Sequence, residues 1–460
     1  MRWRGIEQET SAEEGATDMS GFGQEYRDKR LSDRGRVLLA DNMTVYVNGA
    51  TGLPNTFMQM LASEASALRG IRLCHPMRRE VMALDPDPVA PTLAENIFHI
   101  SDYTYDESIR RAVHEGRASY RPIHSSDGGR HFPYSIDVLV GAAAPMDRHG
   151  YFNLGPFGGW MMDFLTHARK VVLEVNPQQP VVFGDNYVHI SQIDGIIEAD
   201  YPIIEIRQSE SIFGDTERAI ARNVAALVED GATVQAGVGS LPDAIAKTLM
   251  SDGHRDLGVH TESLFDWVVD LYTAGVVTNT HKGQNVGKMT AAMAIGSRAL
   301  YEFIDRNPCV ELQRFSYVND PMVIARNHKP VSINATLQVD LSGQCASEGF
   351  GPRHHGGIGG QWNFHYGASL APDGKGIIAL PSTARKGSVS RIVPSLTAGS
   401  AVSITRNDIH YVVTEYGVAD LRGRPLDERA KLLIGIAHPR FRDELARAAR
   451  EVLGLHVHVA

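Results

Sequence analysis

A single carboxylate, Glu262, lies where the sequence could place a nucleophile. It follows the strand-like segment Leu257–Thr261 and precedes an amphipathic helix that is predicted to run to about Ala274. A carboxylate can act as a covalent nucleophile in group transfer. A carboxylate beside a helix N-terminus can also simply stabilise that helix, by about 0.3–1 kcal/mol. From the residues alone, helix capping is the commoner role, and both interpretations stay open.

Two groups of hydrogen-bond donors follow Glu262 along the chain. Asn319 lies in the segment YVNDP, and Gly359 and Gly360 lie in GGIGGQ. A side-chain amide and a glycine N–H are donors of the kind that stabilise an oxyanion. The alternative is structural, because Asn-Asp-Pro often begins a turn and paired glycines often mark a bend.

A glycine-containing turn precedes Glu262. The segment QAGVGSLPDAI contains Gly237, Val238 and Gly239, whose N–H groups could approach a phosphate or thioester at a helix N-terminus. It lacks the third glycine of a dinucleotide fingerprint, so it does not indicate a nicotinamide or flavin site. The sequence also lacks a Walker A lysine and a G-x-S-x-G motif. His354 and His355 have no carboxylate at helical spacing, and we predict no metal site.

Composition limits the class of protein. A chain of 460 residues predicts two α/β domains of similar size. The net charge of -9 argues against nucleic acid as the main partner, and no apolar run approaches the roughly 20 residues that span a bilayer. Three widely spaced cysteines, Cys74, Cys309 and Cys345, indicate a reducing cytoplasm rather than disulfides or zinc. We expect residues 1–23 to be a disordered tail.

Short apolar segments alternate with amphipathic ones, as in α/β domains. Glycine, proline and then a helix follow a strand twice, about 190 residues apart, which suggests a duplicated domain. We predict one domain over 24–213 and a second over 214–460. The glycine-rich stretch 349–369 is predicted to be a loop. The predicted strands are Met43–Val47, Ile136–Val140, Val171–Val175, Thr233–Gln235, Pro330–Val339, Gly376–Leu380 and His410–Val413, and the predicted helices include Asp215–Glu229, Leu426–Ile436 and Phe441–Val452.

From about Tyr26 onward the chain resembles the acetyl-CoA hydrolase/transferase family, and its 4-hydroxybutyrate CoA-transferase branch most closely. The order and spacing of many short motifs carry this resemblance. They are YRDKRLS, PMDRHGYFNLG, EVNPQQP, QAGVG, LGVHTE, GVVTN, YVNDP, INATLQVDLSGQ, GIGGQWNF, VTEYGVADLRG and IAHPRFR.

The resemblance implies two open α/β domains of the CoA-transferase (NagB/RpiA-like) type, with the active site between them. By position, the family's catalytic residues correspond to Glu262, Asn319 and Gly360. Its CoA-contacting residues correspond to Gly237, Val238, Gly239, Gly359 and Gly360. The implied substrates are acyl-CoA and a short-chain carboxylate such as 4-hydroxybutyrate or butyrate. We expect no tightly bound cofactor, no metal, no membrane or nucleic-acid partner, and a cytoplasmic homodimer.

The implied mechanism is a ping-pong exchange through a glutamyl-CoA thioester on Glu262, which calls for an ionised carboxylate. Two alternatives remain: an acyl-CoA hydrolase, and a catalytically silent CoA-binding protein. The second is suggested by departures from the family pattern at Trp362 and Asn363 in the glycine stretch. Trp160, Trp362 and Tyr366 could reshape an acyl pocket, although aromatic side chains more often serve in packing.

Overall fold

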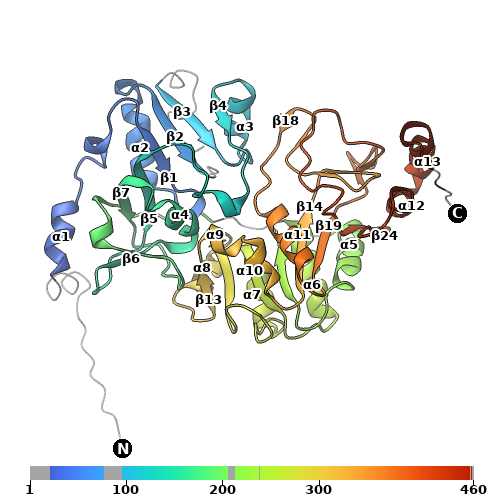
Figure 1. Cartoon of the computed structure of the whole chain (residues 1–460). Helices are drawn as coiled ribbons and strands as arrows, with labels where there is room; N and C mark the ends of the chain where they lie inside the picture. Colours follow the sequence, from blue (N-terminus) through green and yellow to red (C-terminus); the bar gives the residue numbers. More distant parts are fainter. Residues whose placement is uncertain (1–20, 77–95, 206–212, 238, 456, 458–460) are drawn as a thin grey trace, which may run out of the picture.

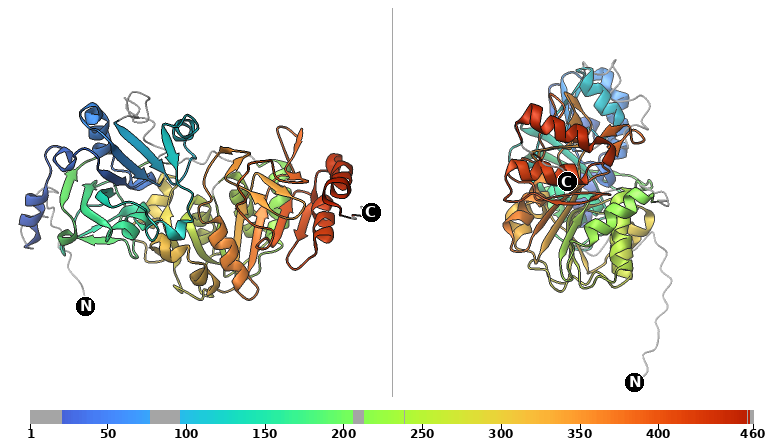
Figure 2. Two further views of the ribbon diagram at one scale, coloured as in Figure 1. Left: turned by 45° about the horizontal axis from the view of Figure 1, so that its top comes forward. Right: turned by 90° about the vertical axis from the view of Figure 1, so that its right-hand side faces the viewer.

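The computed structural model describes residues 21–76, 96–205, 213–237, 239–455 and 457. Two sheets, one in each half of the sequence, lie side by side along the long axis of the molecule (Figures 1 and 2). The first half occupies one end of that axis, and helices α12 (Leu426–Ile436) and α13 (Pro439–Leu453) lie at the other end. The chain is therefore a two-part α/β protein, as its composition predicted.

The first sheet has seven strands in the order β4-β3-β2-β1-β5-β7-β9, and every neighbouring pair is parallel. Its central strand β1 has four buried residues in a row, the pattern of a parallel strand covered on both faces. In chain order its strands are β1 (Thr44–Val47), β2 (Ile71–His75), β3 (Ile97–Ser101), β4 (Ala118–Tyr120), β5 (Ile136–Ala143), β7 (Ala168–Val175) and β9 (Gly195–Glu198).

The second sheet has eight strands in the order β13-β12-β11-β10-β14-β19-β23-β24. All neighbours are parallel except the antiparallel edge pair β23 and β24. Its strands are β10 (Thr233–Ala236), β11 (Gly258–Leu264), β12 (Met289–Ala294), β13 (Val310–Leu312), β14 (Pro330–Ala335), β19 (Lys375–Ala379), β23 (Tyr411–Thr414) and β24 (Gly417–Asp420).

The two sheets share one topology. In each, the first four strands run outward from the centre to one edge, and the next three run outward toward the other edge, where the second sheet adds the antiparallel strand β24. The direction of winding therefore reverses beside β1 in the first sheet and beside β10 in the second. Ligands of open α/β sheets bind at such a reversal, beyond the carboxyl ends of the strands. The repeated strand order agrees with the duplication that the two glycine-proline turns suggested.

Helices cover the sheets and contribute to the contact between the halves. One buried apolar cluster continues from the first half into the second. Where the two halves meet, Trp160 of the first half stacks on Phe315 of the second, with ring centroids 4.7 Å apart. The remaining helices are α1 (Phe22–Lys29), α2 (Asn55–Glu64), α3 (Glu107–His114), α4 (Gly159–Phe164), α5 (Asp215–Ala225), α6 (Ser240–Ser251), α7 (Asp266–Thr273), α8 (Arg298–Ile304), α9 (Phe315–Val318), α10 (Pro321–Ala325) and α11 (Gln361–Leu370).

Most predicted elements are confirmed within a few residues, and two need correction. The predicted strand Pro330–Val339 is two strands, because the chain leaves the large sheet after Ala335 and β15 (Gln338–Asp340) pairs in a small separate sheet. The predicted helix from Asp215 ends at Ala225 rather than Glu229.

The prediction of a loop over 349–369 is wrong for its second half. Residues Gly349–His354 form the short β17–β18 hairpin, and α11 begins at Gln361. Helix α11 forms because tertiary contacts bury it: Asn363, Phe364 and His365 are all inaccessible to solvent or nearly so. Gly367 permits close contact, since a Cβ atom there would lie 2.7 Å from Ile324. The glycine content therefore reflects close packing as well as turns.

Most of the predicted tail lies outside the described residues, and the predicted domain boundary lies just after a segment that is not described. Residues 1–20 are not described, but α1 begins at Phe22, so the last two residues assigned to the tail belong to a helix. The first sheet ends at Glu198 and α5 begins at Asp215, while residues 206–212 are not described. The boundary at 213/214 stays a prediction.

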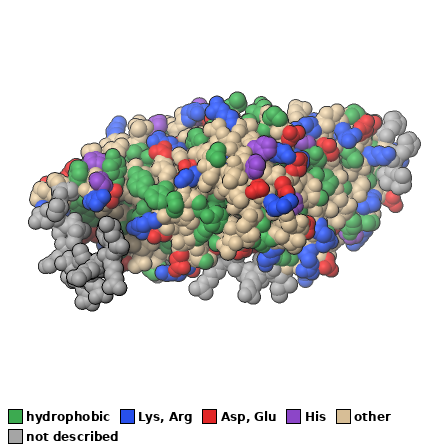
Figure 3. All heavy atoms as spheres, turned by 90° about the horizontal axis from the view of Figure 1, so that it is seen from below, with side chains coloured by type: hydrophobic (Ala, Val, Ile, Leu, Met, Phe, Trp, Pro, Cys, Tyr) green, Lys and Arg blue, Asp and Glu red, His purple; other side chains and the backbone are tan. Residues whose placement is uncertain are grey.

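The surface carries charges of both signs. On the face shown in Figure 3, Lys and Arg side chains are interspersed with Asp and Glu. The described atoms of this face therefore lack the single-sign field that a nucleic-acid backbone attracts. Among the described helices, none is both long enough and apolar enough to cross a membrane.

Candidate active site

Glu262 lies within strand β11 and does not cap a helix. The next helix, α7, begins at Asp266, and Phe265 occupies its N-cap position. Strand β11 runs between β10 and β12, so Glu262 is near the carboxyl end of a central strand. The capping interpretation is therefore wrong, and so is the expectation that β11 ends before Glu262. Helix capping therefore does not explain the presence of a carboxylate at this position.

Asn319 contacts the Glu262 carboxylate directly. Its Nδ2 atom donates a hydrogen bond to Glu262 Oε2 at 2.6 Å, and the residue is fully buried. Asn319 follows α9, where its backbone N–H donates to Phe315 O at 3.0 Å. The next residue, Asp320, caps α10 by accepting from Met322 N at 2.8 Å. The segment is thus a turn, as the structural interpretation held, and the turn aims an amide at Glu262.

The Gly359–Gly360 pair reaches Glu262 from a third element. The Gly360 backbone N–H donates a hydrogen bond to Glu262 from the N-terminus of α11. A Cβ atom at position 360 would lie 2.2 Å from both Asn319 Nδ2 and Glu262 Oε2, so only glycine fits there. Gly359 has φ +56°, and a Cβ atom there would lie 3.4 Å from Glu262 Oε1. The structure therefore brings together Glu262, Asn319 and Gly360, the three residues that the sequence singled out.

The first half of the chain completes the site with residues that the sequence analysis missed. The Ser125 hydroxyl hydrogen-bonds to Glu262. Tyr103 Oη lies 2.8 Å from Ser125 Oγ, and Ser125 N donates to Gly359 O at 3.3 Å. Ser125 begins a short 3₁₀ helix and Tyr103 follows β3. Glu262 therefore lies at the contact between the two halves.

Residues after β3 also hold the glycine stretch in place. Thr104 Oγ1 donates to Gly356 O at 2.8 Å, and Tyr105 Oη donates to Gly357 O at 3.0 Å. A Cβ atom on Gly357 would lie 2.8 Å from the Tyr103 ring. Side chains of the first half thus fix the backbone that leads to the Gly360 N–H. No local sequence signal distinguishes these hydroxyl residues from ordinary loop residues.

Burial and hydrogen bonding act on Glu262 in opposite directions. Burial raises the pKa of Glu262 above its ordinary value, because it disfavours the charged form. Hydrogen bonds from Asn319, Ser125 and the Gly360 N–H lower that pKa. Burial, followed by the charge of Glu262, raises the pKa of Tyr103 well above its usual range, so Tyr103 remains a neutral donor. Burial is the larger of the two effects, so the pKa of Glu262 is raised overall and the three donors only partly offset the rise.

The turn that contains Gly237 and Gly239 follows β10, the strand next to the one that carries Glu262. Gly237 and Gly239 follow β10, the strand paired with β11, and α6 begins at Ser240. A Cβ atom on either glycine would meet no atom within 4 Å, so their backbone borders open space. Gly239 has φ +120°, a conformation that favours glycine. Val238 lies outside the described residues.

The structure gives no support to a metal site or a cysteine nucleophile among the described residues. The described residues contain no group of three or more His, Cys, Asp or Glu side chains arranged to hold a metal ion. Cys74, Cys309 and Cys345 are free, and burial raises the pKa of Cys74 to about 12. These surroundings do not favour a thiolate nucleophile.

The aromatic residues that depart from the family pattern fall into two groups. Trp160 is buried between Phe164 and Phe315, so its role is packing. Trp362 stacks on Tyr366 and lies 4.8 Å from the His124 ring, next to Ser125 in sequence. Asn363 Nδ2 donates to Ser126 Oγ at 2.9 Å. Trp362 and Asn363 therefore contact the segment that carries Ser125.

Two models of one protein family match most of the chain. Residues 23–206 match the acetyl-CoA hydrolase/transferase N-terminal domain, and residues 296–449 match the C-terminal domain of the same family. Glu262 and the Gly237–Gly239 turn lie between the matched ranges. The geometry around Glu262 is thus an observation separate from the two domain matches.

Individual relatives are similar over nearly their full length. A protein named 4-hydroxybutyrate coenzyme A transferase from Clostridium kluyveri is 38% identical over 426 residues, which cover 91% of this chain and 97% of the relative. A succinyl-CoA:cyclohexane-1-carboxylate CoA transferase from Geobacter metallireducens is 40% identical over 407 residues, or 88% of this chain and 90% of the relative.

Solved structures show the same fold. The crystal structure of RipA from Yersinia pestis superposes with a TM-score of 0.86 at 34% identity, over 94% of this chain and 99% of that one. A 4-hydroxybutyrate CoA-transferase from Porphyromonas gingivalis superposes with a TM-score of 0.77 at 33% identity, over 93% of this chain and 99% of that one.

Proposed function

Because the chain belongs to the acetyl-CoA hydrolase/transferase family, we propose that it transfers coenzyme A from an acyl-CoA to a carboxylate through a covalent thioester on Glu262. The observation that carries this proposal is the convergence on one carboxylate of two donors from separate elements, the Asn319 amide at 2.6 Å and the Gly360 N–H. Preorganised donors of this kind stabilise a developing oxyanion.

The first half-reaction begins when a Glu262 carboxylate oxygen attacks the thioester carbonyl carbon. The C–S bond breaks, CoA leaves as a thiolate, and an acyl-glutamyl anhydride remains. The thiolate then attacks the glutamyl carbonyl carbon of the anhydride, which releases the acyl group as a carboxylate and leaves glutamyl-CoA. Asn319 and Gly360 would donate to the carbonyl oxygen as it becomes negative in each addition step.

In the second half-reaction an incoming carboxylate repeats these steps in reverse. It attacks the glutamyl thioester, CoA leaves and returns to the new acyl group, and Glu262 is regenerated. Thioester energy is conserved throughout, so the exchange calls for neither ATP nor a tightly bound cofactor. The covalent route divides one difficult exchange into easier steps.

The first half of the chain supplies the cover over this chemistry. The Ser125 hydroxyl hydrogen-bonds to Glu262, and Tyr103 Oη lies 2.8 Å from Ser125 Oγ. The site is consequently incomplete in either half alone. This arrangement supports transfer, because Glu262 is half-buried at the contact between the halves, which limits access of water to the anhydride and the thioester.

The names of two relatives support short-chain substrates, with 4-hydroxybutyrate or butyrate as acceptor and acetyl-CoA as donor. A cytoplasmic homodimer remains part of the proposal, on the general preference of soluble enzymes for twofold symmetry. The second candidate function is acyl-CoA hydrolysis, which the same covalent intermediates would allow if water replaced the acceptor.

The decisive experiment is the mass of the intact protein after incubation with acetyl-CoA and no acceptor, followed by peptide mapping. A gain equal to coenzyme A on the peptide containing Glu262, lost in Glu262→Ala, is the expected result. Consumption of acetyl-CoA without any adduct would favour hydrolysis. Normal transfer by a folded Glu262→Ala variant would refute the proposed mechanism.

A further inference from the structure

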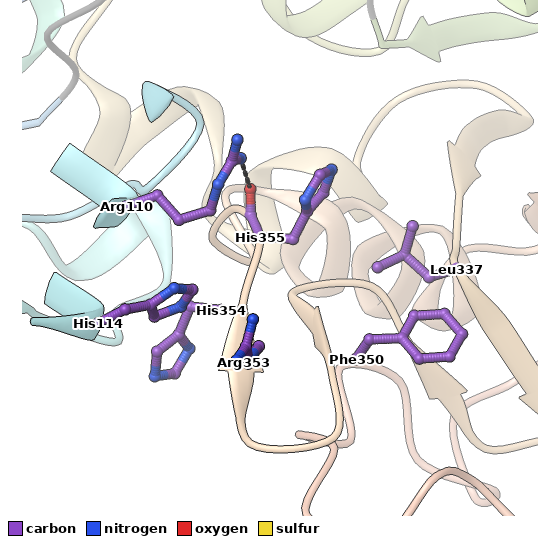
Figure 4. A pocket seen from close by; sticks show the side chains of 7 residues that line it. All are labelled: Arg110, His114, Leu337, Phe350, Arg353, His354 and His355. Atoms are coloured by element: carbon purple, nitrogen blue, oxygen red, sulfur yellow. Dashed lines mark hydrogen bonds between the residues drawn. The ribbon is translucent and has the colours of Figure 1, made fainter. Parts of the chain in front are cut away.

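A hollow lies where the two halves meet, next to the glycine stretch that leads to Gly360. Its volume is about 290 Å³. Helix α3 of the first half contributes one wall, and the β17–β18 hairpin of the second half contributes another (Figure 4). The lining residues are Arg110, His114, Leu337, Phe350, Arg353, His354 and His355.

The polar part of this lining is basic, and its two arginines carry the positive charge. It has two arginines and three histidines and no aspartate or glutamate. Among the ion pairs of the described residues, none includes Arg110 or Arg353. Arg110 Nη1 donates to His355 O at 3.2 Å, which leaves most of the five guanidinium N–H groups for another acceptor. Guanidinium groups that lack a carboxylate partner and face a common hollow suit a phosphate.

The apolar part of the lining faces the cationic part. In Figure 4, Leu337 and Phe350 lie on one side of the hollow, while Arg353, His114 and His354 lie on the other. Phe350 is 47% exposed although it is a large aromatic residue. An exposed aromatic ring beside arginines is the arrangement on which nucleotide bases stack.

We propose that this hollow binds a phosphorylated nucleotide, with phosphate groups against Arg110 and Arg353 and the base on Phe350. The volume is close to the lower limit of ligand sites, roughly 300 Å³, which suits one nucleotide rather than a polymer. Cationic groups reach it from both halves, so a bound phosphate would link α3 to the hairpin.

Two sources could supply this nucleotide, and the first rests on the function proposed above. Coenzyme A ends in a 3′-phosphorylated adenosine diphosphate, and its thioester would react at Glu262, beside the Gly360 N–H. His355 and Gly360 are five residues apart, which an extended chain spans in at most about 18 Å. The nucleotide end could therefore lie in this hollow while the thioester meets Glu262. The second source is a free adenine nucleotide that binds independently of the substrate.

The test is calorimetric titration of the full-length protein with adenosine 3′,5′-bisphosphate, which carries the nucleotide but no thiol. We expect saturable binding that weakens at least about tenfold in Arg353→Gln and in Phe350→Ala. Both side chains lie on an exposed hairpin, so thermal unfolding should be nearly unchanged. Arg450→Gln removes an exposed arginine from α13, far from the hollow, and should leave binding unchanged.

Competition separates the two sources. If saturating coenzyme A prevents bisphosphate binding, the hollow holds the nucleotide end of the substrate; if both bind together, the site is separate. Absence of bisphosphate binding to the wild-type protein, or equal affinity in Arg353→Gln, Phe350→Ala and Arg450→Gln, would overturn the proposal. The Glu262 adduct provides an independent readout: an adduct with no effect of these variants on nucleotide binding refutes only the nucleotide site, whereas bisphosphate binding without an adduct refutes only the transfer mechanism.

Discussion

Replacement of Asn319 by alanine tests the proposed oxyanion site most directly. The change removes the donor that lies 2.6 Å from Glu262 Oε2 and leaves the Gly360 N–H and the Ser125 hydroxyl in place. Loss of one oxyanion donor typically lowers kcat by about 10²- to 10³-fold, or roughly 2.7–4 kcal/mol. We expect a decrease of that size in CoA transfer from acetyl-CoA to butyrate.

The same variant should change the pH dependence in a defined direction. The Asn319 hydrogen bond lowers the pKa of Glu262, so its loss raises that pKa further. Because the attacking form is the ionised carboxylate, activity is present above the pKa and is lost as the pH falls through it. The acidic limb of the kcat/KM profile should therefore move to higher pH in Asn319→Ala.

A second buried asparagine offers a matched control. Asn327 is 5% exposed, and its Nδ2 donates long hydrogen bonds of 3.4 Å to Val323 O and Ile324 O of α10 rather than to Glu262. Asn327→Ala should retain kcat and the position of the acidic limb. The measurement is steady-state transfer between about pH 4 and 9, with thermal unfolding to confirm folding. If Asn319→Ala keeps kcat within about threefold of the wild type, with an unmoved acidic limb, the assignment of Asn319 is refuted.

Three further substitutions probe the same site, and two others serve as controls. Ser125→Ala removes a donor that lowers the pKa of Glu262, so its acidic limb should also move to higher pH, while Ser126→Ala should not change it; an unmoved limb in both would exclude Ser125 from the site. Gly360→Ala places a Cβ atom 2.2 Å from Asn319 Nδ2 and Glu262 Oε2, and should abolish both transfer and the covalent adduct. Gly435→Ala, in α12 with open space around it, should instead raise the free energy of unfolding by about 0.5–1 kcal/mol in denaturant titrations and leave transfer unchanged. Burial raises the pKa of Glu262 above its unfolded value, so its stabilising contribution is present at low pH and is lost as the pH rises through the folded pKa; Glu262→Gln should therefore unfold at a higher temperature than the wild type at pH 7, by a margin that shrinks toward pH 4, and a margin independent of pH would contradict this reasoning.

The elements that local patterns could predict are those whose burial follows from their own residues. Strands β1 and β5 are mostly apolar and almost entirely buried, and α12 begins and ends at the predicted residues. Glu262, Asn319 and Gly360 were identified because each lies in a motif whose order along the chain resembles a known family. These features are local, and a sequence displays them without any long-range contact.

The tertiary structure decided which of these residues meet and what covers them. Asn319 and Glu262 are 57 positions apart, and only the side-by-side packing of β11 and the turn after α9 brings their side chains into contact. Ser125 and Tyr103 carry no periodic or motif signal, and they reach Glu262 because the two halves pack against each other.

Helix α11 is an element that the local sequence did not predict. It lies in the glycine-rich stretch 349–369, which predicted a loop because a segment of this composition has few side chains with which to build a core. Contacts with α10 and the second sheet bury Phe364 and His365 and stabilise the helix. The sequence by itself therefore determined the candidate chemistry and most elements, whereas burial across long chain separations determined the complete site and the helix that supplies the Gly360 N–H.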